Sequence, residues 1–254
     1  VEVTLTHPIE VMSTPVTQRM WFELTGVNPA FYKKGANSFL GIKDYRHVLL
    51  QADHPIEYIT WWSALRFANL VSTNTRLKPA YLFDRETLAN ANYIKGASSG
   101  LFINAFKAPK INAPGGNIYE AEGYRLPTEA EQEYLLQLAS VAIGTGELTS
   151  YAWFEQNSSR TTQPVGTHKP IIINGNKFYD LFGNVLEWGN DILGKLKGGV
   201  NPVNLRGHTR ERSRVMRGGD YRTHDIYLRP DRRYGETPST HSVSTGFRLV
   251  RTLK

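Results

Sequence analysis

Residue types that commonly carry out catalysis are sparse in this 254-residue sequence. There is no cysteine, which excludes disulfides, thiolate nucleophiles, zinc–thiolate sites and iron–sulfur clusters. No two of the seven histidines lie three or four positions apart, which argues against a histidine-based metal site. Neither a glycine-rich phosphate loop nor a Gly-x-Ser-x-Gly turn is present. We expect the closely spaced Glu129, Glu131 and Glu133 to stabilise a helix start, so no catalytic residue is predicted.

Composition and charge narrow the class of protein. Hydrophobic residues make up 40% and charged residues 21%, which are globular values, and no apolar run reaches the length of a membrane-spanning helix. The formal net charge is +7, and residues 195–254 contribute 14 Lys or Arg against 5 Asp or Glu. These arginines are dispersed among Gly, Pro and Tyr, which favours pairing inside the fold over nucleic-acid binding.

Three helices are expected in the first 142 residues. Thr17 and Gly26 are predicted to cap a helix that ends near Thr25. Helical spacing of apolar residues predicts a second helix over 61–72. Thr128 followed by Glu131 forms a capping-box pattern, which predicts a third helix that ends near Ala142.

The remaining elements are expected to be short and irregular. Alternation predicts strands over 1–12 and 54–59, and residues 73–122 are expected to form small hairpins and loops with a turn at 115–117. After Gly144 we expect no long helix, only short strands between turns. The pattern predicts an α+β class and a single domain over residues 1–254.

Five blocks of sequence occur in a fixed order along almost the whole chain: VMSTPVTQRMW (11–21), HPIEYITWWSALRFA (54–68), YRLPTEAEQEY (124–134), PVGTHKPIIINGNKFYDLFGNVLEW (164–188), and RVMRGGDY with TGFRLVR (214–251). Together these blocks resemble the formylglycine-generating enzyme (sulfatase-modifying factor) family. The resemblance implies a C-type-lectin-like fold, with small twisted antiparallel sheets, flanking helices and many irregular loops. Within it we expect Arg125 and Arg217 to be buried against carboxylates and carbonyls, and Trp188 and Phe247 to anchor the core.

The resemblance also indicates what the chain lacks. Catalytic members of the family bind copper through two cysteines between the RGG and GFR blocks, and Asp220–Thr245 contains none here. No copper is therefore expected. Another branch binds iron through three histidines, and this sequence lacks that cluster.

A calcium site is the metal centre that the resemblance retains. In catalytic members, oxygen ligands around the GNxxEW block bind calcium. The matching positions here are Asp180, Gly183, Val185 and Glu187, with Gly183 and Val185 contributing carbonyls. Hard oxygen donors of this kind suit calcium. The alternative is that Glu187 bridges the loop without a metal.

Residues 218–247 form the predicted ligand-binding segment. Lectin-like folds present ligands to the irregular surface between the RGG and GFR blocks, and this segment is rich in Tyr and Arg, which are common contact residues. The expected ligand is a protein or a glycan. The predicted contact residues are Tyr221, His224, Asp225, Tyr227, Arg229, Asp231, Arg232 and Tyr234.

The amino-acid composition of this segment indicates how it could vary. The resemblance extends to variable proteins in which retroelements randomise adenines of Asn-type codons. Such codons, ending in a pyrimidine, cannot encode Lys, Glu, Gln, Met or Trp. These five types make up 41 of the 254 residues, so a 30-residue window should hold about five, whereas 218–247 holds one, Glu236.

The favoured function is therefore a non-catalytic ligand-binding module. Two alternatives remain open: an enzyme of the same family with altered, non-cysteine chemistry, and a structural subunit. Nucleic-acid binding is a weaker fourth reading, which predicts affinity that falls steeply with salt. The sequence shows no signal-peptide pattern; export or a cell-surface location is favoured, and the oligomeric state is left open.

Overall fold

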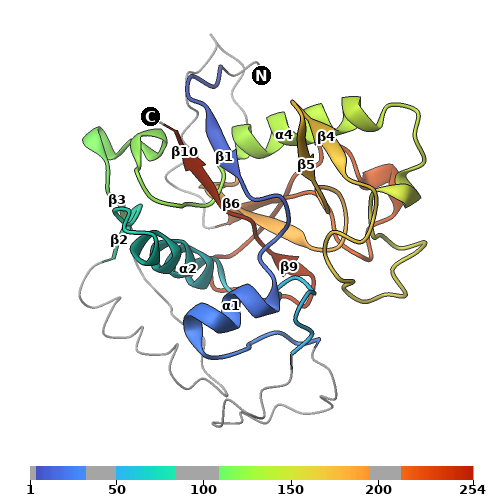
Figure 1. The fold of residues 1–254 in the computed structure, drawn as a ribbon, viewed down its shortest axis with the longest axis horizontal. Coiled ribbons are helices and arrows are strands. Elements are labelled where there is room, and N and C mark those ends of the chain that lie inside the picture. Colours follow the sequence, from blue (N-terminus) through green and yellow to red (C-terminus); the bar gives the residue numbers. More distant parts are fainter. Residues whose placement is uncertain (1–3, 33–49, 84–108, 195–212, 254) are drawn as a thin grey trace.

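The computed structural model describes residues 4–32, 50–83, 109–194 and 213–253. At its centre is a four-stranded sheet in the order β8–β7–β6–β9, made of Tyr234–Glu236, Arg214–Arg217, Leu186–Ile192 and Thr245–Gly246. β6 pairs with β7 antiparallel and with β9 parallel. The first and last strands, β1 (Ile9–Val11) and β10 (Val250–Thr252), pair antiparallel, which brings the two ends of the chain together (Figure 1).

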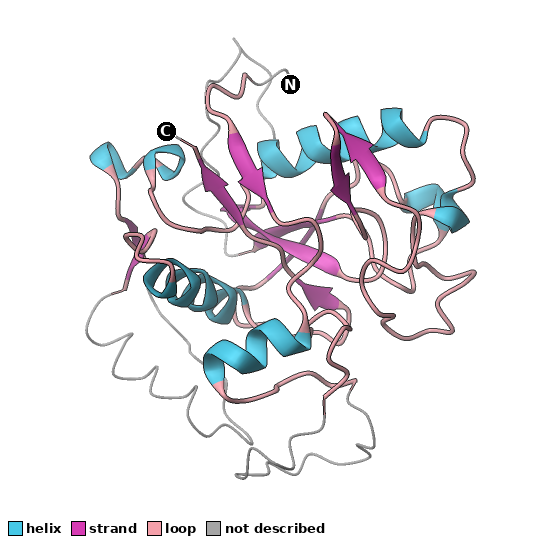
Figure 2. Ribbon diagram, in the orientation of Figure 1, coloured by secondary structure: helices cyan, strands magenta, loops and turns pink. Residues whose placement is uncertain are grey.

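Helices lie around these strands (Figure 2), and two of them begin at the predicted caps. The hydroxyl of Thr17 accepts a hydrogen bond from the Met20 amide at the start of α1 (Gln18–Thr25), and Gly26 ends that helix in a left-handed conformation. The second helix, α2 (Trp61–Asn74), extends two residues beyond the prediction. The capping box of α4 (Glu129–Ile143) is complete, because the Thr128 hydroxyl and the Glu131 carboxylate each bond the other's amide.

Two predicted strands differ from the structure. Residues 54–59 form no strand; Pro55 makes a single bridge to Thr17, and Tyr58 has a positive φ of 61° that breaks an extended run. The strand expected over 1–12 is confined to β1 in the described part, because only there does a partner, β10, supply hydrogen bonds. Alternation in the sequence does not show where a partner strand lies.

Short elements fill the rest of the described chain, as expected. β2 (Tyr81–Leu82) pairs with β3 (Lys110–Ile111), and β4 (Ile171–Ile173) with β5 (Asn176–Phe178). Beyond Gly144 the described residues contain strands and three-residue 3₁₀ turns but no α-helix. The 3₁₀ turns of the described chain are η3 (Pro114–Gly116), which covers most of the predicted 115–117 turn, η4 (Ile118–Glu120), η5 (Leu148–Ser150) and η6 (Asp225–Tyr227).

The core consists of two clusters of buried side chains. In the larger one the Trp21 and Phe67 rings stack at 5.0 Å, and Phe247 meets both edge-on. Trp188, 1% exposed, belongs to the same cluster, so both predicted anchors are buried. The second cluster lies beneath α4 and includes Phe154 and Leu136. Among the described residues no helix has the length and apolar character needed to cross a membrane.

Candidate functional site

A buried asparagine connects the GNxxEW loop to the predicted ligand-binding segment. Asn184 is fully buried with a φ of 57°. Its side chain donates to the Gln163 carbonyl (3.0 Å) and the Asp180 carboxylate (3.1 Å), and accepts from the Gln163 amide (3.0 Å). Its backbone carbonyl accepts from the Tyr221 amide at 3.1 Å. One residue therefore joins the loop before β6 to the segment after β7.

The two carboxylates of the predicted calcium site are engaged by donors of the protein itself. The two Asp180 oxygens accept from the Gly166 amide and from Asn184. Both Glu187 oxygens accept from the Arg248 guanidinium at 2.7–2.9 Å, which already balances the carboxylate charge. Within the described residues no three or more acidic or histidine side chains group as metal ligands. In this arrangement both carboxylates already have protein donors, and calcium binding remains a prediction of the resemblance.

Calcium is accordingly expected to have little effect on stability. Since an ion that binds only the folded state stabilises it by mass action, an occupied site would raise the melting temperature. We expect protein treated with EDTA and protein in 1 mM calcium to melt within about 1 °C of each other. Differential scanning calorimetry checks this, with magnesium as the control ion. A calcium-specific increase of several degrees, lost in Asp180→Ala, would show that the ion displaces these donors.

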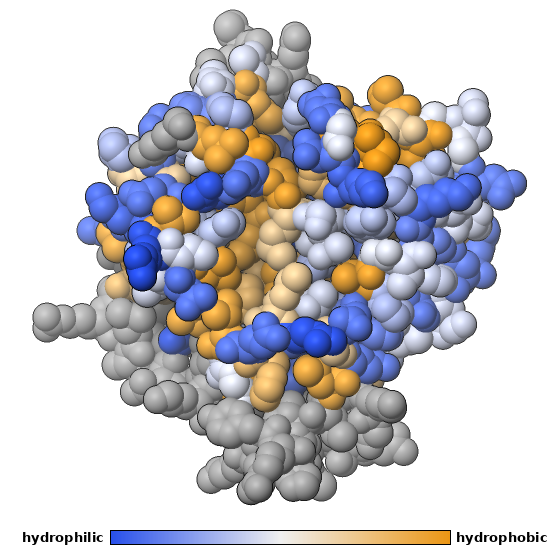
Figure 3. Space-filling model, in the orientation of Figure 1, coloured by the Kyte–Doolittle hydropathy of each residue, from blue (hydrophilic) through white to orange (hydrophobic). Residues whose placement is uncertain are grey.

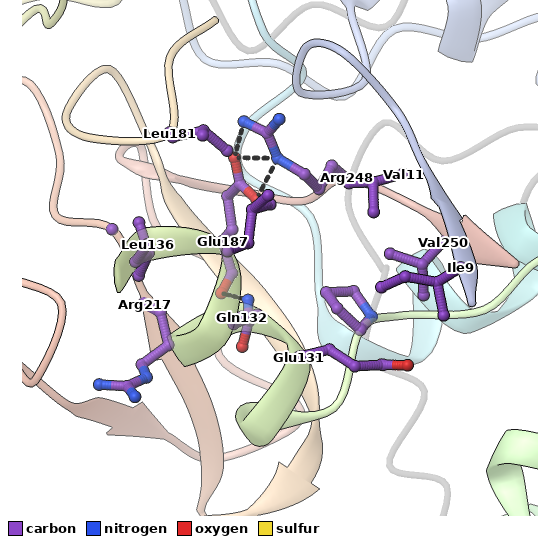
Figure 4. Close-up of a pocket in the computed structure, with 13 residues that line it drawn as sticks. Ile9, Val11, Glu131, Gln132, Leu136, Leu181, Glu187, Arg217, Arg248 and Val250 are labelled. Carbon is purple, nitrogen blue, oxygen red and sulfur yellow. Dashed lines mark hydrogen bonds and ion pairs between the residues drawn. The ribbon is translucent and has the colours of Figure 1, made fainter. Parts of the chain in front are cut away.

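A pocket next to the Glu187–Arg248 pair is the concave feature that Figure 4 shows. It lies between β1, α4 and β10, with an empty volume of about 370 Å³ that includes space open to solvent. In Figure 3 apolar side chains form a strip near the centre of the face where β1 crosses in Figure 1. The charged residues that line the pocket each have a partner in the protein: Glu187 pairs with Arg248, Glu131 with Arg125, and Arg217 with Glu133. This pocket therefore presents no carboxylate without a partner to a substrate.

The predicted ligand-binding residues are mostly at the surface. Tyr221 is the exception: it is fully buried, and its hydroxyl lies 2.9 Å from that of Tyr32. Burial raises the pKa of the Tyr221 phenol, so it stays neutral. As a buried residue it supports the segment and does not present a contact surface. The other seven are exposed or half-buried: His224, Asp225, Tyr227, Arg229, Asp231, Arg232 and Tyr234.

Neighbouring side chains order this exposed surface. The Arg232 guanidinium lies over the rings of Tyr227 (5.0 Å) and Tyr234 (5.4 Å). His224 Nδ1 lies 2.6 Å from the Asp225 carboxylate, and the exposed Arg229 pairs with Asp231 at 3.3 Å. The tyrosine–arginine stack limits the rotamers of three contact residues before any ligand binds.

Two arginine contacts hold the segment to the scaffold. Arg217, buried beside Glu133, donates to the Arg232 carbonyl at 2.8 Å. Arg233 forms a bidentate pair with Glu129 at the start of α4. The first contact uses the main chain of the segment, and the second uses a side chain outside the predicted contact residues.

The structure confirms that Arg125 and Arg217 are buried against carboxylates. Arg125 makes two 2.7 Å bonds to Glu131 and is fully buried, and Arg217 is 1% exposed.

Two features of this region had no signal in the sequence. One is the loop 155–160, described below; the other is a cluster of rings in which Tyr58 meets Phe31 and His241.

The buried carboxylate of Asp191, a β6 residue that faces the start of α4, predicts a pH dependence of stability. Burial raises the pKa of Asp191 from 3.8 to about 6, although Asp191 accepts from the Glu129 amide. A raised folded pKa means that stability falls as pH rises between about 4 and 6. Asp191→Asn keeps an acceptor and removes the charge. Relative to wild type, the variant should gain about 1 kcal/mol in unfolding free energy between pH 5 and 7.5.

Urea unfolding at the two pH values measures this difference. His54 and His168, whose pKa values burial lowers, act in the opposite sense but contribute equally to both proteins. Asp231→Asn, at a 71% exposed side chain, is the control. Its unfolding free energy should differ from that of wild type by the same amount at both pH values. A difference for Asp191→Asn that does not change with pH would contradict the assigned pKa.

Comparison with known proteins identifies the class. A family model described as the sulfatase-modifying factor enzyme 1-like domain matches residues 1–253, so the chain belongs to this family. Among solved structures, it is similar to Treponema denticola variable protein 1, with a TM-score of 0.69 and 26% identity over 96% of this chain and 84% of that one. PvdO from Pseudomonas aeruginosa shares the fold, with a TM-score of 0.65 and 20% identity over 99% of this chain and 83% of that one. The predicted C-type-lectin-like fold of this family is confirmed.

The curated relatives match this chain over only part of their own length. The chain is 27% identical over 197 residues to chaperone protein LppX from Paenibacillus barcinonensis, covering 68% of this chain and 58% of that protein. It is 33% identical over 149 residues to the formylglycine-generating enzyme of Streptomyces coelicolor, covering 50% of this chain and 46% of the enzyme. The chain thus spans about half the length of these relatives.

Proposed function

We propose that the chain is a non-catalytic ligand-binding module that presents the outward side chains of residues 222–234. The observation that carries this proposal is that the exposed side chains and the main chain of the segment have different roles. Its exposed side chains include a tyrosine–arginine stack, whereas its main chain and its buried Tyr221 are held by the scaffold. Exposed Tyr and Arg on a rigid support give binding energy at low entropic cost.

The absence of cysteine supports a binding role over the oxidation chemistry of the family's catalytic members. The named relatives also differ in kind: one is a formylglycine-generating enzyme, one is called a chaperone and one a variable protein. A fold shared by such proteins does not determine activity.

We further propose that residues 218–247 are diversified by a retroelement. The similarity to a protein named variable protein 1 and the scarcity of Lys, Glu, Gln, Met and Trp in this window support it. Sequencing codons 218–250 in many independent isolates is the test. Substitutions concentrated at exposed positions, with Arg217 and Gly218 constant, are expected; an invariant window would contradict diversification and leave a fixed-ligand module.

The same proposal predicts unusual tolerance to substitution. A variant with alanine at His224, Ile226, Tyr227, Arg229 and Asp231 together should melt within about 3 °C of wild type, because exposed positions contribute little to stability. Tyr221→Ala is the matched comparison in the same segment and should lower the melting temperature by about 10 °C or more, since it removes a buried ring. Thermal unfolding of the three proteins decides this, and a five-site variant as unstable as Tyr221→Ala would contradict it.

A further inference from the structure

A second loop, residues 155–160, lies against the segment that presents the proposed contact residues. The Glu155 amide donates to the Thr223 carbonyl at 3.2 Å, and the Ser158 hydroxyl donates to the Tyr221 carbonyl at 2.6 Å. The Gln156 side chain reaches the Asp225 carboxylate at 3.4 Å. More than sixty positions separate the two pieces in sequence, yet they form one continuous surface.

The loop is held rigidly by its own hydrogen bonds. Asn157 accepts from the Phe154 amide at 2.8 Å and donates to the Ala152 carbonyl at 2.9 Å. Phe154 is 1% exposed and belongs to the cluster beneath α4, and Gln163 donates to the Ser158 carbonyl at 2.7 Å. The loop therefore requires little ordering when a partner binds.

Two consecutive residues of this loop have strained backbones. Ser159 and Arg160 have φ values of 55° and 58°, although neither is glycine. Each such residue costs about 1–2 kcal/mol. Strain of this kind persists where the surroundings enforce it, and it is concentrated at functional sites. The side chains of Ser159 and Arg160 are both exposed.

The joint surface combines exposed apolar and charged side chains. Ile226 is 58% and Tyr227 44% exposed, so two large side chains adjacent in sequence are accessible on it. Arg160, Arg222, Arg229 and Arg232 are accompanied by Glu155, Asp225 and Asp231, so the formal charge of these seven side chains is +1. Exposed apolar side chains with charges of both signs suit a protein partner, and a net charge of +1 is small for binding the phosphates of a nucleic acid.

We propose that the ligand-binding face is composite, and that residues 155–160 together with 222–232 bind a protein partner. This inference rests on the proposed function and adds both the second loop and the class of partner. Ile226 and Tyr227 contact an apolar patch of the partner, while Glu155 and Arg160 contact charges of opposite sign.

Random 12-residue peptides displayed on phage, panned against the full chain, are the probe. Enriched peptides are synthesised, and their dissociation constants are measured by biolayer interferometry with wild type and variants. Tyr227→Ala is expected to weaken binding about tenfold, and Arg160→Glu and Glu155→Arg at least about fivefold each. Lys177→Ala, at an exposed position of β5, is the control and should bind as wild type does.

The outcomes separate the two proposals. Peptides that lose affinity with Tyr227→Ala but not with the two loop variants would overturn the composite face and leave the proposed function standing. Failure to enrich peptides, or enriched peptides that no variant affects, would overturn both. Melting temperatures within about 2 °C of wild type confirm that each variant is folded.

Discussion

Replacing Arg248 with methionine is expected to lower the unfolding free energy by about 4 kcal/mol, because it leaves the buried Glu187 carboxylate without its cation. Arg248 is 1% and Glu187 7% exposed. The guanidinium also donates to the carbonyls of Met12, Tyr179 and Asp180 at 3.1 Å. It therefore joins the N-terminal stretch and the loop before β6 to the last strands.

Urea unfolding measures this effect, and two further variants show its cause. Adding Glu187→Leu to Arg248→Met should recover about half of the loss, because no uncompensated charge then remains buried. Arg251→Met is the matched control three residues along: its partner Glu10 is 48% exposed, so the loss should stay below about 1 kcal/mol. Equal losses at Arg248 and Arg251 would show that burial of the pair is not what matters.

The second large effect is expected at Gly183, where alanine should cost more than about 3 kcal/mol. A Cβ there would lie 2.1 Å from the Trp153 carbonyl oxygen, and φ is 74°. Neither a backbone carbonyl nor a left-handed residue adjusts easily to an added methyl group. The bridge between Trp153 and Gly183 positions the start of loop 155–160, so this substitution should also disturb the proposed binding face.

Gly175→Ala separates the two causes of that loss. Gly175 has a φ of 79°, close to that of Gly183, but a Cβ there meets nothing within 4 Å. Alanine at Gly175 should therefore cost only about 1 kcal/mol, the price of the backbone conformation alone. Urea unfolding of both variants gives the comparison. Similar losses would mean that the conformation accounts for the effect, and that the close approach to Trp153 does not.

The proposed binding face shows which features could not be predicted from the sequence. Of the eight predicted contact residues, five are exposed and two are half-buried, but Tyr221 is buried against Tyr32, 189 positions away. Loop 155–160 carried no signal at all, because its partners Tyr221 and Thr223 are reached only through the fold. Alternation and composition describe one segment at a time, so they do not reveal which segments meet.

What the sequence by itself determined about this protein is therefore local chemistry and family membership. Helix caps at Thr17 and Thr128 follow from side chains that bond amides three residues away, and such contacts need no tertiary partner. The lack of cysteine excludes thiolate copper chemistry whatever the fold.

Only the tertiary structure decided the long-range pairings. It paired Glu187 with Arg248, 61 positions away. It also showed that residues 54–59 form no strand and that loop 155–160 lies beside the predicted ligand-binding segment. The physical reason is that charge pairs and strand pairs depend on which distant backbones the core brings within bonding distance.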